Sequence, residues 1–204
     1  MYRFDHYTEK DKEKVISFMK EHAFALITGT GGKYPVATQI PLTIKIKDDK
    51  IFLEGHMMRK TDHHLAFEKN NNVLVLFTGP HCYVSASWYT ERGIGSTWNY
   101  MTVHAKGKMS FMDEQGTRDA VKMVSDKYEG TASADSFDNL PKEYIDHMVK
   151  AIVGFSIEIE ELDNVFKLSQ NRDESSQRNI IEELIKRGDE NSRMIAREMI
   201  KRID

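Results

Sequence analysis

The sequence has a single cysteine among its 204 residues and only four prolines. One cysteine excludes an internal disulfide framework and a structural zinc site built on cysteines. No apolar run approaches the length of a membrane span, and residues 1–14 lack the apolar core of a signal peptide. We therefore expect a cytoplasmic protein that does not associate with a membrane.

The chain also lacks an excess of positive charge, because its formal net charge is −3. Phosphate backbones are bound by clustered Lys and Arg, so this balance argues against a large nucleic-acid footprint. The densest basic segment, residues 187–202, has Glu and Asp interleaved with its bases, as on a solvated helix face. No helix-turn-helix pattern with a basic recognition face is present. DNA binding is therefore supported neither by charge nor by motif.

What the chain does have is an aromatic stretch, residues 81–111, with both tryptophans and three of the eight tyrosines. Alternation over residues 82–89 and 97–109 predicts two strands, and a loop with Gly93 and Gly95 joins them. Loops of this kind often carry function in sheet proteins. The stretch is interpreted either as a ligand-binding wall or as core filler, because Tyr and Trp serve both roles. Its candidate ligand contacts are Tyr83, Ser85, Trp98 and Asn99.

A second candidate site is the run Arg59-Lys60-Thr61, which precedes a short predicted helix through residues 65–67. Arg supplies a bidentate fork, Lys a point charge and Thr a hydroxyl, and a helix N-terminus favours an anion. The run therefore predicts a phosphate site, although an exposed basic loop with Asp62 as N-cap would have the same sequence. In contrast, the glycines of residues 29–32 predict a turn and not a phosphate loop, since no Lys-Ser/Thr pair follows them.

His56, His63 and His64 invite a metal interpretation, because three imidazoles within nine positions could bind zinc or iron. Their spacing matches no standard ligand pattern, and neighbouring histidines on a helix point in divergent directions. We therefore predict no metal site.

The remaining patterns alternate mainly between strand hairpins and short helices. Predicted strands cover residues 24–28, 36–46, 51–54, 73–77 and 153–159, and Gly79-Pro80 is expected to end the fourth of these. Predicted helices cover residues 9–21, 113–128, a segment after Pro141, 175–187 and 191–202. A polar cluster at residues 166–172 follows a predicted turn at residues 163–165. Together these elements predict a mainly β, α+β fold: an antiparallel β-barrel in residues 1–172 with a C-terminal helical arm in residues 173–204.

Several blocks of this sequence resemble the signature of the PaiB family. They are Ser85-Ala86-Ser87-Trp88-Tyr89, Thr97-Trp98-Asn99-Tyr100 and Lys167-Leu168-Ser169-Gln170-Asn171, in the family's order. That family belongs to the FMN-binding split-barrel superfamily, related to pyridoxamine phosphate oxidases. The resemblance, and not periodicity, brings FMN into the interpretation.

The resemblance implies a split β-barrel homodimer with FMN in a cleft between the subunits. It places the flavin phosphate at Arg59, Lys60 and Thr61, after the strand that ends at His56. The isoalloxazine edge would lie along the backbone of Gln39, Ile40 and Pro41. Lys167, Ser169, Gln170 and Asn171 would lie near the ring.

The resemblance further implies a flavin-dependent or redox-linked negative transcriptional regulator. An FMN-dependent oxidoreductase acting on a small molecule is the alternative, and no residue is assigned as its catalytic acid or base. A third possibility is heme binding or degradation, which related split barrels perform and which His56, His63, His64 and His104 keep open. In a flavin site the protein orients and tunes the ring while the flavin carries the redox chemistry.

Overall fold

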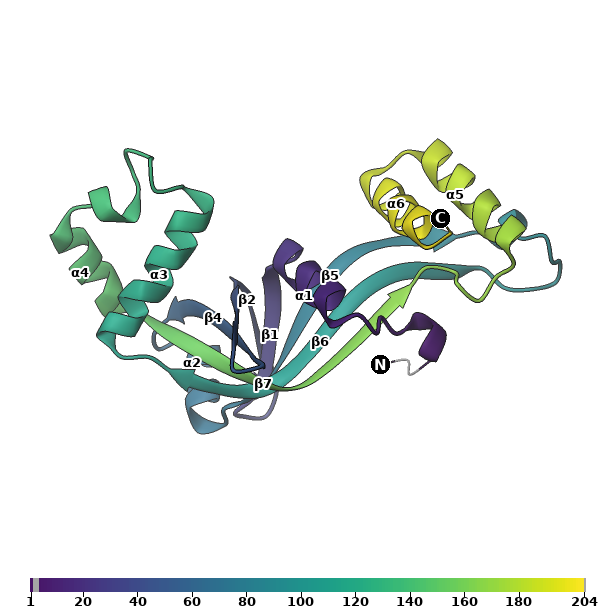
Figure 1. Ribbon diagram of the computed structural model, residues 1–204. Coiled ribbons are helices and arrows are strands. Elements are labelled where there is room, and N and C mark those ends of the chain that lie inside the picture. Colours follow the sequence, from purple (N-terminus) through teal and green to yellow (C-terminus); the bar gives the residue numbers. More distant parts are fainter. Residues whose placement is uncertain (2–3, 204) are drawn as a thin grey trace. The chain divides into compact units, whose positions relative to one another are not determined.

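The computed structural model describes Met1 and residues 4–203 of the chain (Figure 1). The strands are β1 (Phe24–Thr30), β2 (Pro35–Pro41), β3 (Thr43–Lys47), β4 (Lys50–Met58), β5 (Asn72–Val84), β6 (Thr97–Phe111) and β7 (Ile152–Lys167). The α-helices are α1 (Lys12–Glu21), α2 (Asp62–Lys69), α3 (Glu114–Tyr128), α4 (Lys142–Ala151), α5 (Glu174–Arg187) and α6 (Glu190–Ile203). None of these described helices is both long and apolar enough to cross a membrane.

The strands form one sheet in the order β2-β1-β5-β6-β7-β4-β3. The pairings of β1 with β2 and β5, of β3 with β4, and of β4 with β7 are all antiparallel. Both short hairpins predicted from the sequence are present, with the glycine-containing turn between β1 and β2 and the Asp48-Asp49 turn between β3 and β4. Asp48 and Asp49 both have positive φ, as a tight two-residue turn requires.

Contacts along the chain divide it into two compact units. Residues 1–18, 78–103 and 163–204 form the first unit, and residues 19–77 and 104–162 form the second. β5, β6 and β7 contribute residues to both units. The predicted division into residues 1–172 and 173–204 stays a prediction.

In the second unit the sheet curls, because β2 and β4 are in contact although four strands separate them in the strand order. A Cβ on Gly55 of β4 would come within 3.3 Å of Ile40 on β2 and 3.0 Å of Phe155 on β7. The apolar residues of the curled face, including Leu42, Leu53 and Phe155, are almost fully buried. This curled, half-closed barrel confirms the predicted fold class.

Helices α3 and α4 also belong to the second unit. Asp113 caps α3 by accepting a hydrogen bond from the amide of Gly116, and Thr117 of α3 accepts one from the amide of Gly154 on β7 at 2.9 Å. A small apolar cluster lies between the two helices. It consists of Val121, Phe137, Ile145, Val149 and Ile152, with Leu140 and Met148 at its edge.

In the first unit α5 and α6 form a helical hairpin (Figure 1). Asp173 caps α5, and Gly188 ends it in the left-handed conformation, with φ of 73°. Ile180, Leu184, Ile195 and Met199 are at most 1% exposed, whereas Ile185 is 53% and Ile200 38% exposed, although the helical period of residues 175–187 and 191–202 includes all six. The C-terminal helices therefore pack as a pair through part of the apolar positions that their periodicity indicated.

Two predicted strand ends were wrong. β5 runs through Gly79-Pro80 to Val84 without a break, and β7 runs through residues 163–165 to Lys167. A third difference is that the strand predicted over residues 82–89 ends at Val84, because Ala86–Trp88 form a 3₁₀ turn capped by Ser85.

Candidate functional site

The candidate phosphate residues lie where β4 turns into α2, in the second unit. Arg59 and Lys60 are exposed, and Lys60 has a left-handed backbone with φ of 61°. The amide of Arg59 donates to the carbonyl of Ala151 at 2.9 Å, which fixes the backbone of the turn. Among the described residues neither side chain has a hydrogen-bond or ion-pair partner in the protein. Two such cations at one turn suit an anionic ligand.

Thr61, also predicted to contact the phosphate, has a structural role in the helix that follows. Its hydroxyl donates to the carbonyl of Met58 at 3.1 Å and accepts the amide of His64 at 3.3 Å, so it caps α2. The amide of His63 is held by the Asp62 carboxylate at 2.8 Å. The first turn of α2 therefore has few donors to spare, and the capacity to hold a phosphate rests on Arg59 and Lys60. Contact between Thr61 and the cofactor stays a prediction.

His56 lies on the face of β4 that α3 covers. It is opposite Gly154 in the register with β7, and a Cβ on Gly154 would meet Thr117 of α3 at 2.9 Å. Burial lowers the pKa of His56, and its Nδ1 is buried without a hydrogen-bond partner among the described residues. The imidazole is therefore neutral at physiological pH.

The backbone predicted to meet the flavin ring belongs to an edge strand. Gln39, Ile40 and Pro41 pair with Leu26, Ala25 and Phe24 of β1, and β2 is the last strand on its side of the sheet order. An edge strand presents peptide groups along its unpaired side. Such groups suit the carbonyl and ring-nitrogen edge of an isoalloxazine, so the chemistry of this segment fits the predicted cofactor.

In the first unit the β5–β6 hairpin has one exposed aromatic face. Trp98 is 54% exposed and Tyr83 43%, and their ring centroids are 6.0 Å apart in an edge-to-face arrangement. His81 also lies beside Trp98, at 6.1 Å. Ser85 is half-buried, and its hydroxyl is engaged with Ser87. The alternation predicted for β6 is correct, because Asn99, Met101 and Val103 on the opposite face are buried.

The polar block after β7 forms a hydrogen-bonded turn. Ser169 has a left-handed backbone and donates its hydroxyl to the Oδ1 atom of Asn99 at 3.0 Å, and both residues are at most 2% exposed. Gln170 bridges the turn with both ends of its amide. It donates to the carbonyl of Phe166 at 2.5 Å and accepts the amide of Leu168 at 2.7 Å. These contacts give Asn99, Ser169 and Gln170 a structural role, and their predicted contact with the cofactor is untested.

Lys167 and Asn171 are the members of the block with more accessible side chains. Lys167 is half-buried, and its ammonium donates to the hydroxyl of Thr97 at 2.5 Å and lies 5.7 Å from the centroid of the Tyr7 ring. Burial, and to a lesser extent the charge of Arg172, lowers the pKa of Lys167. Asn171 is exposed. A partly desolvated cation at this position is suited to tuning an electron-accepting ring.

The candidate residues thus fall into two sets. The second unit holds Gln39, Ile40, Pro41, His56, Arg59, Lys60 and Thr61, and the first unit holds Tyr83, Ser85, Trp98, Asn99, Lys167, Ser169, Gln170 and Asn171. The groups in these sets fit FMN chemically. The second unit offers two cations for the phosphate and the peptide groups of β2 for the ring, and the first unit offers the Lys167 ammonium for the ring. That both sets line one cleft stays a prediction. Sequence analysis missed Tyr7, which only the fold brings to Lys167.

Residues 1–161 match the family described as "Putative FMN-binding domain". The chain is also 33% identical over 197 residues to the protease synthase and sporulation protein PAI 2 of Bacillus subtilis, and the aligned region covers 96% of this chain and 95% of that protein. These matches confirm the PaiB resemblance and FMN as the cofactor.

Solved structures with this fold include two flavoproteins. The FAD and heme binding protein of Mycobacterium smegmatis has a TM-score of 0.58 at 13% identity, covering 79% of this chain and 73% of that one. The flavocytochrome Anf3 of Azotobacter vinelandii has a TM-score of 0.58 at 14% identity, covering 82% and 72%. At this identity the likeness establishes the fold alone.

Proposed function

Because the chain belongs to the FMN-binding family that its residues 1–161 match, we propose that it is a cytoplasmic, FMN-dependent or redox-linked negative transcriptional regulator. One observation carries the proposal that this chain binds the flavin through its own residues. Arg59 and Lys60 lie exposed at a fixed turn, without partners among the described residues, where the resemblance expects the phosphate. Bound FMN supplies electron-transfer chemistry, and the protein holds and tunes it.

The phosphate assignment is tested with the double variant Arg59→Ala/Lys60→Ala. Hydrogen bonds to charged groups contribute about 1.5–3 kcal/mol each when well formed, and exposure reduces this. We expect FMN to bind about ten- to hundredfold more weakly, while riboflavin, which lacks the phosphate, loses less than threefold. The matched control is Lys47→Ala/Lys69→Ala, which removes the same charge from exposed positions of the same unit. Equal losses for FMN and riboflavin would place the phosphate elsewhere.

The proposal includes a homodimer with the flavin cleft at the subunit interface. Its support is the resemblance, together with an edge strand at β2 and an exposed aromatic pair at Tyr83 and Trp98, since surfaces of this kind usually have partners. Light scattering after size exclusion is expected to give twice the mass of one chain. A monomer at micromolar concentration that still binds FMN would rule out an interfacial cleft.

For the regulatory role, the C-terminal helices form a base-rich segment, but four of the seven Lys and Arg residues of α5 and α6 form ion pairs. Arg178 pairs with Glu174, Lys186 with Glu183, Lys201 with Glu198 and Arg202 with Glu9. Regulation therefore proceeds through a partner or through weak DNA contacts and not through strong direct readout. A gel-shift at physiological salt tests this: binding at nanomolar concentration to one sequence over random DNA would contradict indirect action.

The same ion pairs favour a second candidate, an FMN-dependent oxidoreductase that acts on a small molecule. Such an enzyme needs no basic nucleic-acid surface, and it needs no acid or base beyond the flavin for hydride transfer. Anaerobic mixing with NADH or NADPH separates the candidates. Steady turnover with an added electron acceptor supports the enzyme, whereas a flavin that is reduced only stoichiometrically supports the redox-linked regulator.

A further inference from the structure

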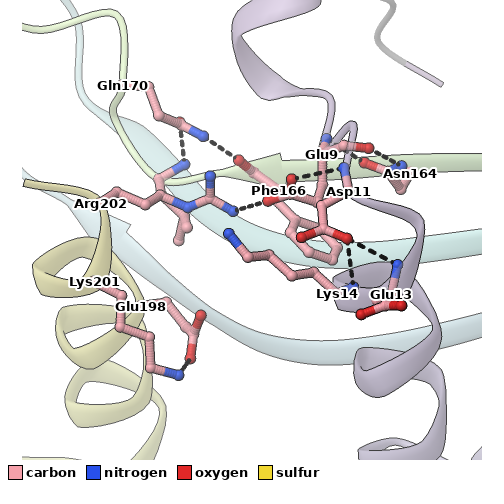
Figure 2. A network of polar contacts seen from close by, with 11 residues as sticks. Glu9, Asp11, Glu13, Lys14, Asn164, Phe166, Gln170, Glu198, Lys201 and Arg202 are labelled. Atoms are coloured by element: carbon pink, nitrogen blue, oxygen red, sulfur yellow. Dashed lines mark hydrogen bonds and ion pairs between the residues drawn. The ribbon is translucent and has the colours of Figure 1, made fainter.

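The N-terminal segment of the first unit is held at Glu9 by the side chains of Asn164 and Arg202, which lie far from it in sequence. The amide of Glu9 donates to the Oδ1 atom of Asn164 at 2.7 Å, and Asn164 returns a hydrogen bond to the carbonyl of Glu9 at 3.0 Å. The side-chain amide of Asn164 thus bonds to both the N–H and the C=O of Glu9, as the backbone of a paired strand would. Residues 155 positions apart in sequence are thus joined (Figure 2).

The carboxylate of Glu9 is held by Arg202, in the last turn of α6. The guanidinium donates to Oε2 at 2.8 Å, and the Glu9 side chain is only 9% exposed. Burial acts to raise the pKa of Glu9, but the amide of Asp11 and the charge of Arg202 outweigh it, so that the pKa is lowered. This ion pair is therefore better shielded from solvent than the other pairs of α5 and α6.

Arg202 also reaches the turn that follows β7. Its guanidinium lies 6.0 Å from the ring centroid of Phe166, and the carbonyl of Phe166 accepts the amide of Gln170 that closes the turn. Figure 2 shows Arg202, Glu9, Phe166 and Gln170 in one network, while Lys201 points away to Glu198. The end of α6 thus contacts both the N-terminal segment and the residue next to Lys167.

Tyr7, two residues before Glu9, brings the same N-terminal segment into contact with Lys167. It is 7% exposed, and its ring lies 5.7 Å from the Lys167 ammonium. On its other side Lys167 is held by the hydroxyl of Thr97. The ammonium of Lys167 is therefore in contact with a residue of the N-terminal segment that lies two positions from Glu9.

We propose that Arg202 is a positioning residue of the flavin site, which holds the N-terminal segment through Glu9 and so fixes the Lys167 ammonium toward the ring. This role rests on the proposed FMN function for its effect on the cofactor, but not for its effect on Lys167 itself. Arg202 touches neither the cofactor nor a reacting atom.

The first test needs no flavin. Acylation of Lys167 by an N-hydroxysuccinimide ester, followed by mass spectrometry of the folded protein, measures how well the lysine is held and covered. Arg202→Gln and Glu9→Gln should each raise its rate about three- to tenfold, and Arg202→Lys should restore at least half of the difference. The control Arg197→Gln changes an exposed arginine of the same helix. A rate for Arg202→Gln equal to that of Arg197→Gln would overturn the positioning role.

The second test is a thermodynamic cycle on FMN affinity. Arg202→Gln should weaken FMN binding about fivefold and shift the visible flavin spectrum, and the loss should vanish in a Lys167→Met background because Arg202 acts through Lys167. Additive losses would overturn the proposal, since a purely structural role lowers stability in either background. If the wild-type protein binds no FMN, the proposed function fails, and the acylation result still decides whether Arg202 positions Lys167.

Discussion

The turn between β1 and β2 packs so closely on α2 that one methyl group should disturb it. A Cβ on Gly31 would lie 2.4 Å from the Cα of Ala66 and 2.5 Å from its Cβ. One of these atoms is in the helix backbone and the other is attached directly to it, so neither can move away by a side-chain rotation. The neighbouring Gly32 has nothing within 4 Å of such a Cβ, and neither glycine has a positive φ.

The difference between these two glycines sets the expected magnitude. Ordinary van der Waals contact begins near 3.4 Å, so Gly31→Ala requires α2 to move by about 1 Å. Overpacking of this kind costs about 1–3 kcal/mol, and we expect a loss near the upper end, about 2–3 kcal/mol, because the contacted atoms are rigid. Gly32→Ala should be neutral or slightly stabilising, by up to about 1 kcal/mol, through the entropy of the unfolded chain.

Urea unfolding followed by circular dichroism measures both variants against the wild type. The expected loss for Gly31→Ala corresponds to a melting temperature about 5–10 °C lower in a protein of this size. Since α2 follows Arg59 and Lys60 directly, the same variant should also weaken FMN binding. If Gly31→Ala is as stable as Gly32→Ala, the packing of the turn on α2 is not as described.

Three further predictions concern buried polar groups. Burial lowers the pKa of His56 below 6.5, so the imidazole is protonated at higher pH in the unfolded chain than in the folded protein, and the free energy of unfolding should fall as the pH drops below about 6.5. His56→Gln should reduce this dependence of the free energy of unfolding on pH by up to about 1.4 kcal/mol per pH unit, and equal slopes for the variant and the wild type between pH 7.5 and 5.5 would contradict the prediction. Burial raises the pKa of the Cys82 thiol to about 12, so a disulfide reagent at pH 8 should label it only after denaturation, and rapid labelling of the folded protein would oppose this. Ser169→Ala leaves the buried Asn99 oxygen without its donor and should cost about 1–3 kcal/mol in urea unfolding, whereas the exposed control Ser110→Ala should stay within about 0.5 kcal/mol.

Sequence patterns predicted the sheet well where burial is one-sided. The alternation over β6 identified the buried face at Asn99, Met101 and Val103 because one side of that strand packs on the protein and the other meets solvent. The end of the helix predicted over residues 175–187 was likewise a local signal, because Gly188 ends α5 in the left-handed conformation. Such features depend on residues within one or two turns of each other, which a pattern can detect.

The predicted strand ends were wrong where one side of a strand has no neighbouring strand, because a proline or polar residue there disrupts fewer sheet hydrogen bonds. Pro80 was expected to end a strand, yet β5 continues past it, because the pairing of β1 with β5 covers only Val73 to Leu76. Beyond that point a missing amide removes no bond to β1. Similarly, β4 pairs with β7 only up to Glu158, so the polar residues beyond it lie on a strand with an unpaired side. The strand after Val84 ends instead because Ser85 bonds to the amide of Ser87, a local alternative to the sheet.

The candidate site was predictable only in part for the same reason. Arg59 and Lys60 are adjacent in sequence, so their pairing at one exposed turn could be predicted, and their contact with a phosphate stays a prediction. Lys167 contacts Tyr7 and Thr97, and Glu9 pairs with Arg202, and no periodicity connects these residues. Ser169 and Gln170 were predicted as ligand donors, and in the structure the Ser169 hydroxyl donates to the side chain of Asn99 while the Gln170 side chain donates to the carbonyl of Phe166.

The central claim, that this chain binds FMN, is tested most directly by identifying the cofactor in the purified protein. The absorption spectrum is recorded after saturation with FMN and gel filtration, and the cofactor released by acid is identified by chromatography. We expect flavin absorption and close to one FMN per chain. A colourless protein that retains no FMN, or a red one with a heme Soret band and no flavin, would contradict it.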